Sequence, residues 1–122
     1  MTIRRIIVLD ANRKVWNLVA RAIKSLLGCR VEGFSFLEDA QTTLTDALHF
    51  DIRLFVIGDV PELERPEVRK WAHELYMAGH KVVWLSKTPP PLAEITHVIK
   101  TEPFTQALES EILVTLQRVL RS

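Results

Sequence analysis

The strongest constraint on the fold is a regular alternation of short apolar runs with longer segments of helical periodicity. The apolar runs are short and rich in β-branched residues, which predicts buried strands; they fall at residues 3–9, 29–34, 52–57, 81–86 and 97–100. Strands separated by helices run parallel, and right-handed crossovers place helices on both faces of the sheet. The sequence therefore predicts an α/β fold, a three-layer α/β/α sandwich around a five-stranded parallel sheet.

Four helices are predicted between these strands, from apolar spacing and from residues typical of helix ends. They cover approximately residues 12–27, 35–49, 66–79 and 105–120. Asp10 or Asn12 is expected to cap the first helix and Gly28 to end it. Pro66 suits the first turn of the third helix, and Thr105 is expected to cap the last one.

The segment between the fourth and fifth strands has no room for a full helix. Pro89, Pro90 and Pro91 exclude helix where they stand, so only about one turn, Leu92–Ile95, is expected there. A stiff proline loop lowers the entropy cost of binding. We therefore consider this loop either a partner-docking edge or simply a short connection.

Composition predicts one domain over residues 1–122, because 48% hydrophobic and 25% charged residues are ordinary for a globular chain of this length. No apolar run reaches the roughly 18 to 20 residues that span a bilayer, and the N-terminus lacks a secretory signal. A lone Cys29 excludes an internal disulfide and fits a reducing compartment. We expect a cytoplasmic protein without membrane insertion.

Positive charge is concentrated at the N-terminal end. Residues 1–30 carry seven basic residues and one acidic residue, a net +6, which leaves −5 on the remainder of a chain with net charge +1. This face is either a solvated helix surface or a surface for an acidic partner or a phosphate backbone. Arg13, Trp16 and Arg21 are candidate partner contacts on it, with core packing as the alternative for Trp16. No DNA-binding motif supports direct nucleic-acid binding, which is the weakest of the functional alternatives.

Several local features together resemble the receiver domain of bacterial response regulators (CheY-like) over essentially the whole chain. They are Ile6–Asp10, Phe50–Ile52 before the central strand, Pro61 after it, Val83–Ser86 and Glu102–Phe104. The resemblance implies the flavodoxin-like strand order 2-1-3-4-5, with the family's fourth helix shortened or missing. It also implies a role in two-component signal transduction or transcriptional regulation.

Family members catalyse phosphoryl transfer with an acid pair after the first strand, an aspartate ending the third, a hydroxyl ending the fourth and a lysine before Pro-Phe. The carboxylates hold a divalent cation, which neutralises the transferred phosphoryl group together with the lysine and the hydroxyl. In this sequence Asp10 matches the first acid and Ser86 the hydroxyl. Ala11 replaces the second acid, and Glu102 stands in the lysine position.

The phosphoacceptor position itself has no oxygen nucleophile. It falls on Ile57 when counted from Pro61, and on Val56 when counted from Asp51. Asp59 is the nearest acid, and it is either a turn or cap residue or a displaced phosphoacceptor. Lys87 and Lys100 are the candidates to replace the missing lysine.

The departures from the family pattern predict a degenerate receiver, or pseudo-receiver, which is not an enzyme and needs neither metal nor cofactor. It is expected to act by phosphorylation-independent contact with a protein partner: a kinase, an output domain or a second copy. The alternative is a receiver that accepts a phosphoryl group on Asp59.

Overall fold

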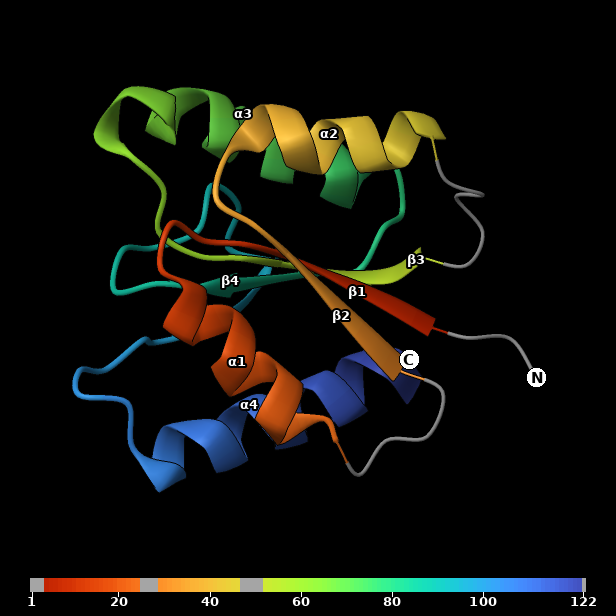
Figure 1. Ribbon diagram of the computed structural model, residues 1–122. Coiled ribbons are helices and arrows are strands. Elements are labelled where there is room, and N and C mark those ends of the chain that lie inside the picture. The colour runs from red at the N-terminus through yellow and green to blue at the C-terminus, as the bar shows by residue number, and fades with distance from the viewer. Residues whose placement is uncertain (1–3, 25–28, 47–51, 122) are drawn as a thin grey trace.

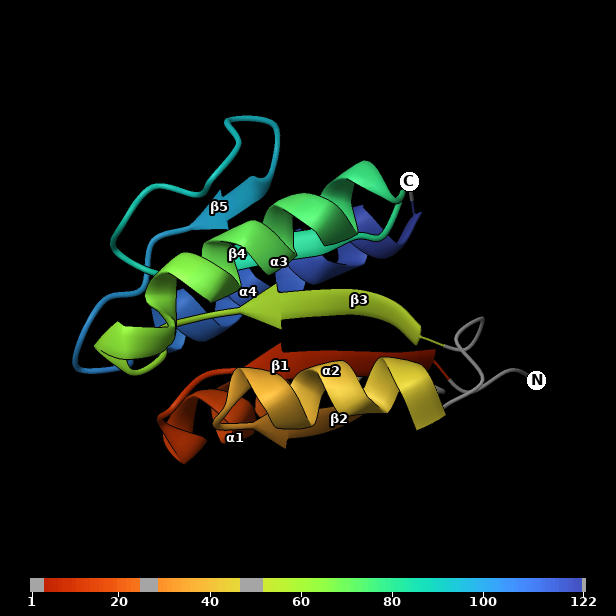
Figure 2. The ribbon, with the colours of Figure 1, turned by 90° about the horizontal axis from the view of Figure 1, so that it is seen from above.

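The computed structural model describes residues 4–24, 29–46 and 52–121, and these form three layers (Figure 1). The sheet contains β1 (Arg4–Leu9), β2 (Cys29–Phe34), β3 (Ile52–Ile57), β4 (Val82–Leu85) and β5 (Thr96–Val98). All pairings are parallel and the order is β2-β1-β3-β4-β5, which Figure 2 shows from above. The predicted fold class and strand order are confirmed.

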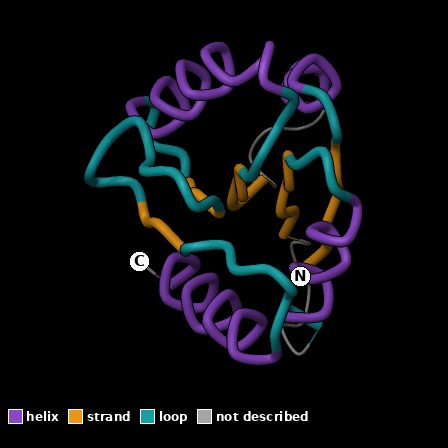
Figure 3. The backbone as a smooth tube through the Cα atoms, turned by 90° about the vertical axis from the view of Figure 1, so that its left-hand side faces the viewer, coloured by secondary structure: helices purple, strands orange, loops and turns teal. Residues whose placement is uncertain are grey.

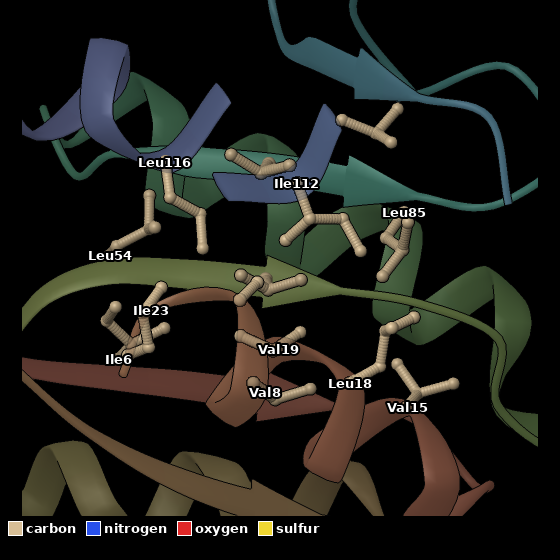
Figure 4. Packing of buried hydrophobic residues seen from close by; sticks show 14 of the residues in the cluster. Ile6, Val8, Val15, Leu18, Val19, Ile23, Leu54, Leu85, Ile112 and Leu116 are labelled. Carbon is tan, nitrogen blue, oxygen red and sulfur yellow. The ribbon is translucent and has the colours of Figure 1, made fainter. Parts of the chain in front are cut away.

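Two helices cover each face of the sheet. α1 (Arg13–Ala22) and α4 (Gln106–Arg121) lie on one face, and α2 (Leu37–Asp46) and α3 (Arg65–Met77) lie on the other. A short 3-10 helix, η2 (Glu62–Glu64), leads into α3. Each face has its own hydrophobic cluster, and Figure 4 shows buried side chains of α1, α4 and the strands pointing toward one another. This burial is the main stabilising contribution.

The predicted helix starts hold, whereas one predicted end was wrong. Asn12 caps α1, because its Oδ1 accepts a hydrogen bond from Lys14 N at 3.0 Å. Thr105 Oγ1 likewise accepts from Leu108 N at 3.2 Å, and Pro66 lies in the first turn of α3. α1 ends at Ala22 rather than running on to residue 27, with Ile23 as its C-cap. The predicted cap Gly28 lies outside the described residues.

No helix forms between β4 and β5, as the prolines predicted. The connection is a loop, and the hydrogen bonds that hold it include Trp84 Nε1 to Thr88 O at 2.9 Å, Arg69 Nη1 to Pro89 O at 2.8 Å, and Ile95 N to Leu92 O at 3.1 Å. The last of these closes the single predicted turn.

β5 differs from its predicted range, residues 97–100. It spans Thr96–Val98, so Ile99 is 58% exposed and Lys100 lies beyond the strand. Because the chain has left the ladder at this point, the Lys100 side chain can turn toward the strand ends rather than into a hydrophobic layer.

Parallel strands bring all their carboxyl ends to one edge of the sheet, and Figure 3 looks onto this edge. The loops there carry Asp10 after β1, Asp59 after β3, Ser86 after β4 and Lys100 after β5. This is the edge where ligands bind in open α/β sheets.

Candidate functional site

Asp10 is the innermost charged group of the site. Its residue is only 1% exposed, and both carboxylate oxygens are bonded. Oδ1 accepts from Asn12 N at 2.8 Å, while Oδ2 accepts from Asp59 N at 3.0 Å and from Lys100 Nζ at 2.8 Å. A buried carboxylate is tolerated only when it is paired and hydrogen-bonded in this way.

Lys100 joins the two carboxylates of the site. Its side chain is 4% exposed, and Nζ lies 2.8 Å from Asp10 Oδ2 and 2.6 Å from Asp59 Oδ2. Burial by itself would lower the pKa of Lys100, but the hydrogen bonds and charges of Asp10 and Asp59 outweigh it and the pKa is raised. The ammonium group therefore stays charged between two acids.

Asp59 forms the outer wall of the site, with its side chain 49% exposed. Oδ1 accepts a hydrogen bond from Ser86 Oγ at 2.7 Å, and Oδ2 faces Lys100. Partial burial raises the pKa of Asp59, but the bonds from Lys100 and Ser86 and the nearby charges of Lys100 and Arg65 lower it further, so the pKa lies below its usual value. Asp59 is thus a pocket carboxylate as well as a turn residue.

Gly58 leaves the space that this arrangement needs. Leu9 is paired with Ile57, so Gly58 lies beside Asp10 at the strand ends. A Cβ on Gly58 would lie 2.1 Å from Asp10 Oδ2, which is far too close for any side chain. The absence of a side chain here lets Asp59 N reach Asp10.

Ser86 connects the pocket to the loop after β4. It is 1% exposed, its Oγ accepts from Thr88 N at 3.2 Å, and it lies 3.1 Å from Thr88 Oγ1. His97 Nε2 lies 2.8 Å from Ser86 O. The hydroxyl that faces Asp59 is therefore held in place by its own loop.

The side chains of the other predicted pocket positions take no part in these contacts, although Ala11 N donates to Asp59 O at 2.8 Å. Ile57 and Val56 are 0% and 1% exposed, and they pack in the two hydrophobic clusters on opposite sheet faces. Ala11 and Glu102 are exposed and line an open depression of about 460 Å³ in front of Asp10, Asp59 and Lys100. Lys100 was expected from the sequence only as one of two candidates to replace the missing lysine. In the structure it lies at the centre of the network, bonded to both carboxylates.

The donor set does not fit the magnesium ion that the resemblance implies. The Ala11 side chain offers no ligand oxygen, both oxygens of Asp10 are bonded, and the Lys100 ammonium lies between the two carboxylates. Over residues 4–24, 29–46 and 52–121, no three His, Cys, Asp or Glu side chains come together as metal ligands. A divalent cation here would lie directly against a buried positive charge.

The candidate partner contacts of the N-terminal face are largely engaged within the fold. Trp16 Nε1 donates to Asp10 O at 2.9 Å, its ring packs against Gly33, and the Arg13 guanidinium lies 5.8 Å above that ring. Arg21 Nε pairs with Glu109 Oε1 at 3.1 Å across α1 and α4. Arg13 and Arg21 nevertheless remain exposed at the surface.

The proline loop is exposed at Pro89 and half-buried at Pro90 and Pro91. Its bond from Arg69 to Pro89 O holds it against α3. The loop is therefore a preformed surface rather than a loose connection.

A parallel sheet of this order, with an aspartate, a hydroxyl and a lysine at its carboxyl edge, has the fold of response-regulator receiver domains. The chain is similar to a response regulator from Thermotoga maritima, with a TM-score of 0.73 at 17% identity, covering 98% of both chains. The similarity to chemotaxis response regulator CheY4 of Vibrio cholerae has a TM-score of 0.68 at 17% identity, and it covers 97% of this chain and 99% of that one. The similarity to an orphan response regulator of H. pylori has a TM-score of 0.71 at 11% identity, and it covers 98% of both chains.

No family model matches the sequence, and a search of curated proteins gave no match either. The structural likeness therefore defines the receiver fold at low sequence identity. None of the helices in the described ranges has the length and apolar character needed to cross a membrane.

Proposed function

We propose that this chain is a receiver-like signalling module that acts through protein–protein contact, without phosphorylation and without catalysis of its own. The receiver fold supports a role in signal transduction. The observation that carries the proposal is the Lys100 ammonium, which bonds Asp10 at 2.8 Å and Asp59 at 2.6 Å. The pocket carries its own cation.

Phosphoryl transfer to a carboxylate needs a free oxygen nucleophile and a cation that neutralises the charge developing on the phosphoryl oxygens. Asp59 Oδ1 is bonded to Ser86 and Oδ2 to Lys100, while Ala11 and the bonded Asp10 give a divalent cation few ligands. The network therefore favours one fixed state of the pocket over a phosphorylation cycle.

A fixed pocket leaves the surface as the means of signalling. We infer a cytoplasmic protein partner, which is a kinase, an output domain or a second copy of this chain. The surfaces that fit this role are the Pro89–Pro91 loop, held against α3, and the exposed Arg13 and Arg21 beside Trp16.

A second candidate function has a specific observation in its favour. Asp59 is half exposed, keeps a lowered pKa, and has Ser86 Oγ and Lys100 Nζ within 2.7 and 2.6 Å. These are the chemical groups of a phosphoacceptor, supplied from displaced sequence positions.

One experiment decides between the two candidates. The chain is incubated with acetyl phosphate and Mg²⁺, and its intact mass is measured alongside Asp59→Asn and Ser86→Ala variants. We expect no phosphoryl adduct on any of them. An adduct on the wild-type chain that disappears in Asp59→Asn would overturn the proposal and establish the phosphoacceptor instead.

A further inference from the structure

A second, smaller cavity lies between the turn after β3, the first turns of α3 and the loop after β4. It encloses about 170 Å³, and Lys100 does not line it. Asp59 forms part of its wall, so it adjoins the pocket described above but has different walls.

The deep side of this cavity is apolar. Val60, Val68 and Trp84 line it, and they are 6%, 1% and 4% exposed. Such a wall favours a short aliphatic group, because burying apolar surface is the main non-directional source of affinity.

Two guanidinium groups also line the cavity. Arg65 and Arg69 are one turn apart on α3 and therefore share a helix face. Arg69 is held in place, since its Cζ lies 5.6 Å above the Trp84 ring and its Nη1 donates to Pro89 O. The Arg65 side chain makes no hydrogen bond or ion pair with another residue that the structure describes, although its charge acts on Asp59.

Asp59 offsets only part of this positive charge. It is bonded to Ser86 and Lys100 and interacts electrostatically with Arg65, while Lys100 is shared with Asp10, so the three cations and two carboxylates leave a net charge of 3 − 2 = +1. Two like charges one helical turn apart repel each other. The cavity thus presents an excess of positive charge and several unused N–H donors beside an apolar wall.

We propose that this cavity binds a carboxylate carried on a short aliphatic stem. The guanidinium fork matches the planar carboxylate, and the neighbouring Asp59 disfavours a more highly charged phosphate. A volume of about 170 Å³ corresponds to roughly six water molecules at about 30 Å³ each, which sets the ligand at about six non-hydrogen atoms. The site goes beyond the proposed function and does not depend on whether Asp59 accepts a phosphoryl group.

Butyrate is the probe that fits this description, and butyramide is its neutral counterpart. The full chain, labelled with ¹⁵N, is titrated with each compound while the Trp84 indole N–H and Arg69 Nε–H resonances are followed by NMR. We expect saturable shifts with butyrate and a Kd of about 1 mM, since so small a ligand gains little total affinity. Butyramide is expected to give no saturable shift.

Arg65→Gln is the decisive variant, because the Arg65 side chain makes no hydrogen bond or ion pair with another described residue. It should weaken butyrate binding at least about tenfold while leaving the rest of the spectrum unchanged. Lys70→Gln removes the same charge from an exposed position of α3 outside the cavity, and it should bind butyrate as the wild type does.

The proposal is overturned if butyrate gives no saturable shift at these two resonances, if butyramide binds equally well, or if Lys70→Gln weakens binding as much as Arg65→Gln. Competition with the blocked peptide acetyl-Ala-Glu-Ala-amide identifies the source of the carboxylate. A peptide that displaces butyrate at lower concentration indicates the acidic side chain of a protein partner. A peptide that competes weakly or not at all indicates a free small acid.

Discussion

At the scale of single residues, the site depends on one ammonium group shared by two carboxylates of unequal exposure. Asp10 is buried and bonded through both oxygens, whereas Asp59 is half exposed. Removing the shared cation therefore affects the two acids differently. Asp59 can turn to water, but Asp10 would remain buried with an uncompensated charge.

Lys100→Met should accordingly destabilise the fold by about 3–5 kcal/mol, the usual cost of breaking a buried ion pair on one side. Adding Asp10→Asn should recover part of the loss, because the two residues are in direct contact and their effects are not additive. Urea unfolding followed by tryptophan fluorescence measures both variants. Lys87→Met, at an exposed lysine, is the matched control, with an expected change within about 0.5 kcal/mol. Equal losses for the two methionine variants would contradict the role given to Lys100.

The lowered pKa of Asp59 predicts an acid-side loss of stability. Partial burial opposes ionisation of Asp59, but Lys100 and Ser86 favour it more strongly, so the folded pKa lies below the unfolded value of 3.8. The ionised form thus stabilises the fold fully above about pH 4, and this contribution is lost as the pH falls through the folded pKa. Asp59→Asn should lose less stability than the wild type as the pH is lowered below about 4, measured by urea unfolding. If the free energy of unfolding falls with pH in the same way for both proteins, the ionised Asp59 does not stabilise the fold as predicted.

At the scale of elements, the loop after β4 takes the place of the helix that receiver domains have between their fourth and fifth strands. Trp84 Nε1 bonds to Thr88 O, Arg69 to Pro89 O, and Ile95 packs at 2% exposure against the α3 side of the sheet. The loop thus covers the sheet edge that a helix would otherwise cover. Its shape comes from fixed dihedral angles and a few bonds rather than from a helical ladder.

Replacing Pro89, Pro90 and Pro91 together by alanine should destabilise the fold by about 1–2 kcal/mol, because the unfolded chain gains conformational freedom. Amide hydrogen exchange should also rise across residues 86–95, while α4 stays protected. If exchange in this segment matches the wild type, the prolines are not what holds the loop.

Elements were easier to predict from the sequence than the site. The prolines excluded a helix after β4 by local sterics, and the alternation of apolar runs required a parallel sheet. Lys100 was harder, because its role depends on where β5 ends: two residues more of strand would have kept it in the ladder. The position of Asp59 likewise depends on Gly58 admitting its backbone beside Asp10, a close approach that sequence spacing alone does not reveal.

At the scale of the whole molecule, a pocket with its own cation should not respond to added metal. Any ligand that binds only the folded state raises the free energy of unfolding, by about 2.7 kcal/mol at a concentration one hundred times its Kd, and therefore raises the thermal midpoint. We expect the thermal midpoint of the chain to be the same in about 10 mM Mg²⁺ as in the same ionic strength of Na⁺. The double variant Lys100→Met with Ala11→Asp, which removes the ammonium and restores the second acid, should show a rise with Mg²⁺. If Mg²⁺ raises the thermal midpoint of the wild-type chain, the Lys100 ammonium does not take the place of a bound metal ion.

The bond between Asp10 and Lys100 also affects the order in which the newly made chain can fold. The two residues are 90 positions apart, so at about 5–20 residues per second Asp10 is synthesised roughly 5–18 s before its partner. During that interval its carboxylate must remain hydrated, and the end of β1 cannot close into the core. β1 can thus reach its final state only after residue 100 has left the ribosome, which makes late completion of this strand a property of the fold.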